Sequence, residues 1–178
     1  VMTLIDGLIK DEKIAENSGI LFVDDGSADS TWEKITSMCR GNNRIRAIKL
    51  SANRGHQNAL LAGLMYAKKY ANAAISMDAD LQDDINASVR MIDEYHEGNE
   101  IVYGVRKSRK TDTVFKRGTA QFFYRFMKFL GTDIIYNHAD YRLMGKKALN
   151  ALAEYGEVNL FLRGIVPQLG FRHTTVEY

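Results

Sequence analysis

The chain has 178 residues, of which 46% are apolar and 26% charged, a composition ordinary for a globular protein with one sizeable core. Its net charge of only +2 excludes a generally basic, nucleic-acid-binding surface. The single cysteine, Cys39, excludes an internal disulfide, and no apolar run approaches the roughly 18 residues that a membrane-spanning helix needs. We therefore expect a single domain over residues 1–178 and no nucleic-acid partner.

Helices and strands are predicted to alternate along the first hundred residues. Apolar residues at helical spacing predict a helix within 2–16, and the apolar run 20–24, which ends in turn residues, predicts a buried strand. The same patterns predict further strands at 45–50, 73–78 and 100–105, and helices at about 31–40, 56–70 and 84–97. Ser30 and Glu33 have the spacing of a capping box, so we expect the Ser30 side chain to cap the helix that follows it.

This alternation predicts an α/β fold with a doubly wound, mostly parallel sheet and helices on both faces. Such sheets usually open with a strand, whereas this chain opens with a helix, so we expect a first strand upstream of Val1. After residue 105 the pattern changes. A basic segment leads into an aromatic helix at about 117–130, and a helix at about 145–155 and a strand near 171–177 follow.

Polar residues follow the first three predicted strands, at the ends where open parallel sheets bind ligands. The three strand ends are residues 24–27 (Asp-Asp-Gly-Ser), 51–56 (Ser-Ala-Asn-Arg-Gly-His) and 78–82 (Asp-Ala-Asp-Leu-Gln). They carry acids, amides and small residues, so they could form one site.

The third strand end predicts a metal site. Asp78 and Asp80 are two residues apart, and such positions project to the same side of an extended segment. Two carboxylates in a small volume repel each other, and a hard divalent cation relieves that repulsion. Gln82, again two residues on, could add an amide oxygen. Although an Asp-x-Asp pair also arises by chance, its place at a strand end favours Mg²⁺ or Mn²⁺ bound together with substrate phosphates.

The first two strand ends leave two interpretations open. Asp24, Asp25 and the residues after them suit a simple strand-to-helix turn, but a carboxylate there could also accept hydrogen bonds from a nucleotide. Gly55 is either a turn glycine or a position where the backbone approaches a ligand closely.

Three segments together resemble successive motifs of family-2 glycosyltransferases. These segments are residues 23–31 (Val-Asp-Asp-Gly-Ser-Ala-Asp-Ser-Thr), 53–59 (Asn-Arg-Gly-His-Gln-Asn-Ala) and 77–84 (Met-Asp-Ala-Asp-Leu-Gln-Asp-Asp). Residues 103–106 (Tyr-Gly-Val-Arg) and 140–144 (Asp-Tyr-Arg-Leu-Met) are further matches. The resemblance covers nearly the whole chain and is closest to the polyprenyl-phosphate branch, which includes dolichol-phosphate mannose synthases and bactoprenol-phosphate glucosyltransferases.

The resemblance implies a GT-A type fold and an inverting transfer. The sugar would pass from a UDP- or GDP-linked donor to a polyprenyl (undecaprenyl or dolichyl) phosphate. It implies that Asp25 contacts the donor nucleoside, that Asp78, Asp80 and Gln82 hold the metal and diphosphate, and that Arg106 and Arg117 bind the acceptor phosphate. We group Asp24, Gly55 and Asp78 with Asp25 as the nucleotide-sugar site. The catalytic candidates are Asp80 and Asp140, the latter at the position of a proposed acid or base. The family's first strand would precede Val1, and a basic segment and transmembrane helices would follow Tyr178.

The segment from 106 to 117 supplies cations for such an acceptor. It contains the arginines Arg106, Arg109 and Arg117 as well as three lysines, and guanidinium groups bind phosphate in bidentate fashion. Its alternative interpretation is a solvated basic loop. The aromatic helix at 117–130 suits either the core or a membrane interface. Together with the resemblance, these features predict that the protein acts at the cytoplasmic side of the membrane. A homo-oligomer is compatible with this location.

Other functions have weaker support from the residues. A transferase that adds sugar to a hydroxyl of a polysaccharide or glycolipid, and a non-catalytic nucleotide-binding module, are the main alternatives. A phosphoryl-transfer domain would normally carry its nucleophile on the first strand, whereas the aspartate pair here follows the third predicted one. A dinucleotide-dependent dehydrogenase is disfavoured because the chain lacks a Gly-x-Gly-x-x-Gly segment.

Overall fold

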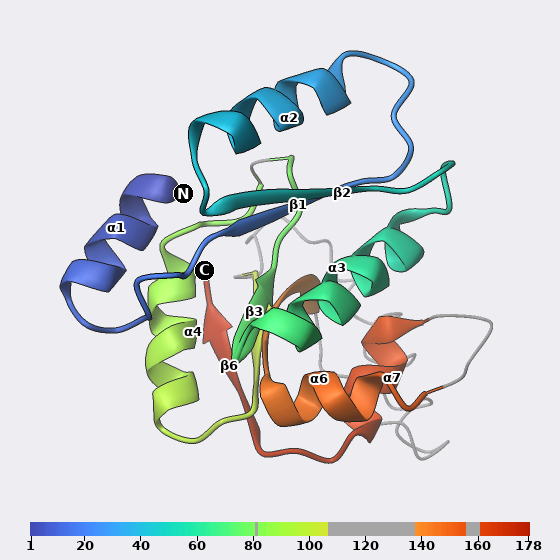
Figure 1. Ribbon diagram of the computed structural model, residues 1–178. Helices are drawn as coiled ribbons and strands as arrows, with labels where there is room; N and C mark the ends of the chain where they lie inside the picture. The colour runs from blue at the N-terminus through green and yellow to red at the C-terminus, as the bar shows by residue number, and fades with distance from the viewer. Residues whose placement is uncertain (81, 107–137, 156–160) are drawn as a thin grey trace, which may run out of the picture. The chain divides into compact units, whose positions relative to one another are not determined.

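The computed structural model describes residues 1–80, 82–106, 138–155 and 161–178 (Figure 1). Over these residues the chain divides into two compact units, Val1–Asn72 and Ala73–Tyr178, and each is described by itself. The predicted aromatic helix at 117–130, together with Arg109 and Arg117, lies outside the described residues. Among the helices that are described, none has the length and apolar character needed to cross a bilayer.

The first unit is built around two parallel strands. Its elements are α1 (Met2–Lys10), β1 (Ile20–Asp24), α2 (Thr31–Gly41), β2 (Ile45–Lys49) and α3 (His56–Tyr70). β1 and β2 pair in parallel, from Ile20 opposite Ile45 to Asp24 opposite Lys49. Figure 1 shows α2 and α3 on opposite sides of this pair. Because the strands are parallel and in register, their carboxyl ends, which carry two of the predicted site segments, lie side by side.

The start of α2 corrects one prediction. Ser30 is the N-cap residue, as expected, but its side chain makes no capping hydrogen bond. The carboxylate of Asp29 instead accepts a hydrogen bond from the Thr31 amide at 3.0 Å. The expected capping box is therefore wrong, because the preceding aspartate reaches the first turn of the helix and takes the place of the serine hydroxyl.

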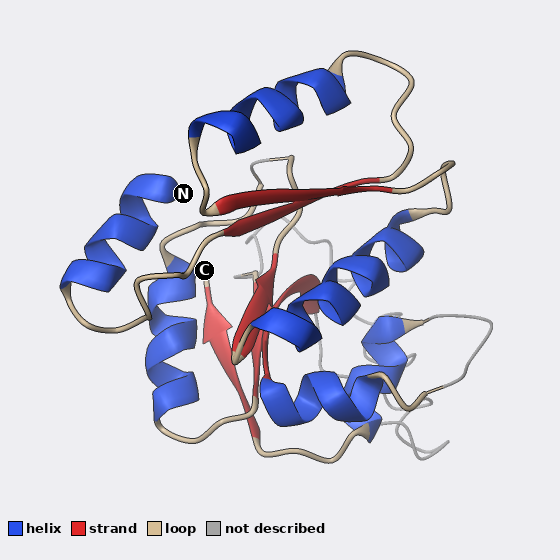
Figure 2. Cartoon of the chain, viewed as in Figure 1, coloured by secondary structure: helices blue, strands red, loops and turns tan. Residues whose placement is uncertain are grey.

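The second unit contains a four-stranded mixed sheet. Its elements are β3 (Ala73–Ser76), α4 (Ala87–His96), β4 (Ile101–Val105), β5 (His138–Gly145), α6 (Lys146–Leu152), α7 (Leu162–Gln168) and β6 (His173–Glu177). The strand order is β3-β5-β4-β6. β5 is antiparallel to both β3 and β4, whereas β4 and β6 are parallel. Figure 2 shows these strands in red, with helices on either side of them.

This topology gathers several chain segments at one edge of the second sheet. β3 and β4 run in the same direction, because each is antiparallel to β5, and β6 runs parallel to β4. The carboxyl ends of β3, β4 and β6 therefore share one edge with the beginning of β5. We call this edge the site edge, because the residues that reach it are 77–80, 82, 83, Arg106, Asp140 and Tyr178.

Helices cover both faces of this sheet. Met91 of α4 is fully buried, and a Cβ at Gly104 would lie 2.9 Å from its Cε atom and 3.0 Å from the main-chain oxygen of Tyr141, so glycine at this position permits the close packing. On the opposite face, α6 and α7 bury Leu149 and Leu162. The centre of the sheet is buried, since Val102 and Tyr103 have no exposed surface. The site edge is thus the rim of a buried core.

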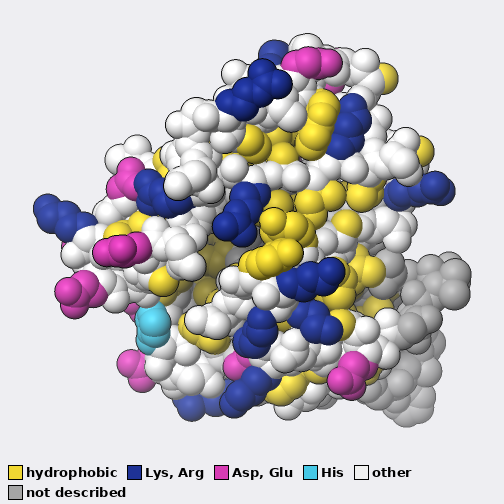
Figure 3. Space-filling view, viewed as in Figure 1, with side chains coloured by type: hydrophobic (Ala, Val, Ile, Leu, Met, Phe, Trp, Pro, Cys, Tyr) yellow, Lys and Arg dark blue, Asp and Glu magenta, His cyan; other side chains and the backbone are white. Residues whose placement is uncertain are grey.

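On the face drawn in Figure 3, Lys and Arg side chains lie among the other residue types.

Candidate active site

The acidic loop that follows β3 lies at the site edge. In it, Asp78 is half-buried, whereas Asp80 and Gln82 are exposed. One carboxylate oxygen of Asp80 accepts a hydrogen bond from the Gln82 amide at 3.0 Å. This local bond restrains the direction in which the Asp80 carboxylate points.

The residue types of this loop match the ligand preference of the predicted metal. Two carboxylates and an amide oxygen are hard ligands of the kind that Mg²⁺ and Mn²⁺ prefer, and Mg²⁺ commonly takes one or two carboxylates and completes its shell with water and substrate phosphates. Within the described residues, no group of three or more His, Cys, Asp or Glu side chains could hold a metal ion. The predicted ligand set does not require such a group, because it contains only two acids. It remains a prediction.

Arg106 approaches the same loop from the end of β4. Its Nη2 donates to Asp83 Oδ1 at 2.8 Å, and its Nη1 makes a weaker contact with Gln82 Oε1 at 3.4 Å. The hydrogen bond to Asp83 raises the pKa of Arg106 further above its ordinary value. The fold therefore brings a predicted metal ligand, Gln82, and a predicted acceptor-binding cation, Arg106, into contact.

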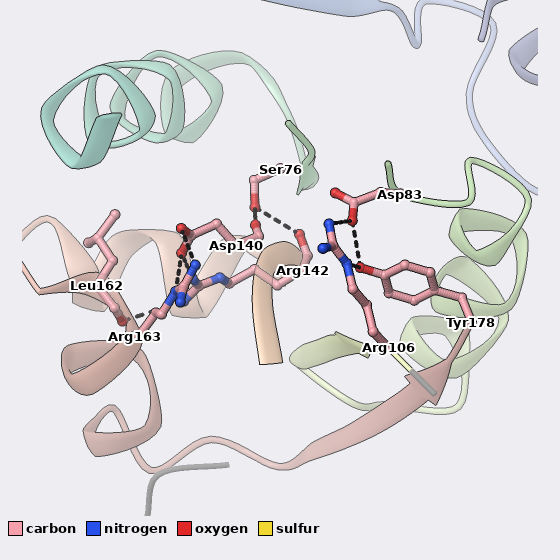
Figure 4. A network of polar contacts seen from close by, with 8 residues as sticks. All are labelled: Ser76, Asp83, Arg106, Asp140, Arg142, Leu162, Arg163 and Tyr178. Atoms are coloured by element: carbon pink, nitrogen blue, oxygen red, sulfur yellow. Dashed lines mark hydrogen bonds and ion pairs between the residues drawn. The ribbon is translucent and has the colours of Figure 1, made fainter. Parts of the chain in front are cut away.

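Asp83 and Tyr178 complete a polar cluster around Arg106, shown in Figure 4. The Asp83 side chain is only 1% exposed, and its Oδ1 also accepts a hydrogen bond from the Tyr178 hydroxyl at 2.6 Å. The same hydroxyl accepts a hydrogen bond from Arg106 Nε at 3.2 Å. Burial, together with the hydrogen bond to Asp83, raises the pKa of Tyr178 to about 12, so the phenol stays protonated at neutral pH.

Asp140 lies at the site edge on β5, beside the end of β3. The Ser76 hydroxyl donates to its main-chain oxygen. Its carboxylate is paired with two arginines: Oδ1 with the buried Arg142, and Oδ2 with Nη2 of the half-exposed Arg163 at 3.1 Å. Figure 4 shows both guanidinium groups turned toward it.

This environment bears on the predicted acid or base role of Asp140. The Asp140 side chain is 4% exposed, and both carboxylate oxygens accept hydrogen bonds from guanidinium groups. A proton-transfer group must reach the atom whose proton it moves. In this arrangement Asp140 orders two cations, and its catalytic role remains a prediction.

In the first unit, Asp25 joins the loops that follow β1 and β2. Its two carboxylate oxygens accept hydrogen bonds from the amides of Arg54 at 2.7 Å and Gly55 at 2.9 Å. Gly26 makes this approach possible, because a Cβ there would lie 2.5 Å from the Ala52 carbonyl carbon. Gly55 has a φ of +84°, which favours glycine, so the turn interpretation of this residue agrees with its conformation.

Asp24 points inward instead. It is 3% exposed, and its Oδ1 accepts hydrogen bonds from both the amide and the hydroxyl of Ser27. The hydrogen bond from the Ser27 hydroxyl lowers the pKa of Asp24, and Lys49 at 3.7 Å acts in the same direction. Asp24 thus stabilises the turn, while Asp25 is the more accessible of the two acids. The nucleotide-binding roles predicted for both remain predictions.

The site also contains four residues without a predicted role: Asp83, Arg142, Arg163 and Tyr178. One available signal was the alternation along β5: Asp140 and Arg142 are two residues apart and so project from the same face of a strand. Asp83 directly follows the predicted metal ligands. No local pattern connects it with Tyr178, which is 95 positions away in the sequence.

The fold and the site define an α/β protein that presents an acidic loop and an ordered arginine at one sheet edge. The profile of glycosyl transferase family 2 matches residues 4–153. The chain belongs to this family, which implies the GT-A type fold and confirms that part of the sequence prediction.

Individual relatives agree with this assignment. The uncharacterized glycosyltransferase YkoT of Bacillus subtilis is 57% identical over 175 residues, which cover 98% of this chain and 52% of that protein. The bactoprenol glucosyl transferase of Shigella phage SfX is 34% identical over 160 residues, which cover 89% of this chain and 52% of that protein. The chain therefore spans about half the length of the curated relatives it matches.

Proposed function

We propose that this chain is the catalytic domain of a glycosyltransferase that moves a sugar from a nucleotide-diphosphate-sugar to a polyprenyl phosphate. We place the reaction at the cytoplasmic side of a membrane. The observation that carries the proposal is the contact of Arg106 with Asp83 and Gln82, which puts a cation beside the acidic loop. The relatives named bactoprenol glucosyl transferase support the choice of acceptor.

The proposed reaction brings two anions together. An oxygen of the acceptor phosphate would attack the anomeric carbon, and the bond between that carbon and the donor diphosphate would break. Arg106 would hold the acceptor phosphate, because a guanidinium group matches phosphate geometry. Asp78, Asp80 and Gln82 would hold Mg²⁺ or Mn²⁺, which when bound neutralises the charge on the leaving diphosphate.

A phosphate acceptor has little need of a general base to remove a proton. A phosphate monoester is already largely anionic at neutral pH, so its oxygen needs no strong base. The paired state of Asp140 is compatible with this chemistry. If Asp140 does act as acid or base, the pH dependence of kcat will contain an ionisation that Asp140→Asn removes.

In the first unit, the loops joined by Asp25 are the proposed contact for the donor nucleoside. Because the Asp25 carboxylate accepts two main-chain hydrogen bonds, we expect it to hold the shape of the 53–55 loop as well as to face the ligand. Asp25→Ala should then weaken donor binding without changing the acceptor KM. Titration of UDP- and GDP-sugars against both proteins measures this.

The test of the proposed function is a donor screen with the full-length protein. UDP- and GDP-sugars are supplied with undecaprenyl phosphate in detergent, with Mg²⁺, with Mn²⁺ or with a chelator. We expect metal-dependent transfer from one nucleotide class, and a loss of roughly 100-fold or more in Asp80→Asn. Asp93→Asn makes the same chemical change at an exposed position of α4 and serves as the matched control.

Two results would count against the proposal. Undiminished transfer in the presence of chelator, or wild-type rates in a folded Asp80→Asn variant, would remove the metal assignment. Transfer to a hydroxyl-bearing polysaccharide or glycolipid, with none to undecaprenyl phosphate, would replace the acceptor with the alternative considered from the sequence.

A further inference from the structure

Three side chains at the site edge form a closed hydrogen-bonded triangle. Arg106 donates through Nη2 to Asp83 and through Nε to Tyr178, and Tyr178 donates to Asp83. These residues follow β4, β3 and β6, so the triangle connects three chain segments at the rim of the sheet.

The triangle holds two of the three guanidinium nitrogens of Arg106. Nε and Nη2 are held by Tyr178 and Asp83, while Nη1 is directed toward Gln82. The Arg106 side chain is 42% exposed, although the carboxylate that holds it is buried. Within the described residues, the second oxygen of Asp83 is buried and accepts no hydrogen bond. Among the described residues, the cation paired with this carboxylate is Arg106, at 2.8 Å.

We propose that Asp83 and Tyr178 are positioning residues that hold the Arg106 guanidinium beside the acidic loop, in the orientation that receives the acceptor phosphate. The inference rests on the proposed function. It adds two residues that act through Arg106 and that need not touch substrate themselves. They hold the Arg106 side chain in one orientation before the acceptor binds. Less side-chain entropy is then lost on binding.

The structure offers a control that separates positioning from simple anchoring of the loop. The Tyr141 hydroxyl donates to the main-chain oxygen of Asp84 at 3.0 Å, so Tyr141 anchors the same loop one residue further on. Tyr141 packs edge-to-face against Tyr178, with ring centroids 5.2 Å apart. Burial raises the pKa of both phenols to about 12. Of these two hydroxyls, only that of Tyr178 is bonded to Arg106.

The experiment compares Tyr178→Phe with Tyr141→Phe in the full-length protein. Transfer is measured against undecaprenyl phosphate and against the donor found in the screen, and thermal melting establishes that each variant is folded. We expect Tyr178→Phe to raise the acceptor KM roughly tenfold, the usual effect of losing a hydrogen bond to a charged group. Tyr141→Phe should leave the acceptor KM within about twofold of wild type, because its bond ends on the loop backbone. Neither variant should change the donor KM.

A double-mutant cycle shows whether the effect passes through Arg106. Lysine at position 106 keeps the charge but cannot make the forked contact with Asp83 and Tyr178. In the Arg106→Lys background, Tyr178→Phe should therefore cause little further rise in the acceptor KM. A folded Asp83→Asn variant should likewise cause little further rise in the acceptor KM in this background. If Asp83→Asn does not fold, the test relies on Tyr178→Phe.

The outcomes separate this inference from the proposed function. An active wild type with equal acceptor KM values for Tyr178→Phe and Tyr141→Phe would overturn the inference alone. The inference would also be overturned if Tyr178→Phe raised the acceptor KM by the same factor in the Arg106→Lys background as in wild type. The tyrosine would then act independently of the arginine. A folded wild type that transfers no sugar to undecaprenyl phosphate would overturn the proposed function, and this inference with it.

Discussion

Two pairs of carboxylates, one pair in each unit, are held in different ways. In the first unit, Asp24 and Asp25 accept hydrogen bonds mainly from backbone amides and a serine hydroxyl, with Lys49 3.7 Å from Asp24. In the second, Asp83 and Asp140 are paired with arginine side chains. Both kinds of interaction hold a carboxylate in place. The hydrogen bonds of the first unit depend mainly on the path of the main chain, whereas the ion pairs of the second depend on complementary charge.

The difference predicts which substitutions each unit tolerates. Amides point at a carboxylate only when the loop that carries them has the right shape, so the first unit should be sensitive to changes at glycine. A buried guanidinium that loses its carboxylate becomes an uncompensated charge, so the second unit should be sensitive to the loss of one partner.

The largest expected effect is that of Asp140→Ala. Arg142 is 1% exposed, and this change would leave its guanidinium buried without its carboxylate partner. We expect the free energy of unfolding to fall by about 3–5 kcal/mol, measured by chemical denaturation. Arg163→Gln removes the other partner of the same carboxylate, but the Arg163 side chain is 45% exposed. It should therefore cost about 1 kcal/mol or less. Equal losses in the two variants would show that burial does not set the strength of this cluster.

The corresponding test of the first unit is Gly26→Ala. Gly26 has a φ of +72°, and a Cβ there would lie 2.5 Å from the backbone of Ala52. We expect a loss of about 2–3 kcal/mol in the free energy of unfolding, since both the conformation and the close contact are disturbed. Gly7→Ala is the matched control, because a Cβ at that helical position meets nothing within 4 Å. The control should be neutral or stabilise the protein by up to about 1 kcal/mol. A neutral Gly26→Ala would mean that the two loops can move apart freely.

The smallest predicted effect depends on pH. The Ser27 hydroxyl lowers the pKa of Asp24, so this bond contributes stability above the carboxyl's ordinary pKa, and the contribution is lost as the pH falls through the lowered value. Ser27→Ala should therefore reduce the free energy of unfolding by about 1–2 kcal/mol at pH 7, and by progressively less below about pH 4. Denaturation of both proteins across this range measures it. A difference that grows toward low pH would have the wrong sign for this pair.

The order and type of most secondary-structure elements could be predicted from local pattern. The predicted helix at 56–70 coincides with α3, and the apolar run 20–24 forms β1. Parallel pairing holds for β1 with β2 and for β4 with β6. The antiparallel strand β5 was missed, because charged residues such as Asp140 and Arg142 interrupt any apolar run in its sequence. Only its partners on both sides, β3 and β4, identify it as a central strand.

Some features of the candidate site could likewise be predicted from local sequence, and others could not. Sequence alone determined the family, the α/β class and the acidic and cationic residues that carry the proposed chemistry, because these depend on residue type and short spacing. Only the tertiary structure decided that Arg106 meets Asp83 and Tyr178, and that Asp140 is paired with Arg142 and Arg163. The physical reason is that these contacts join segments distant in sequence, and strand order and direction determine which of them share an edge.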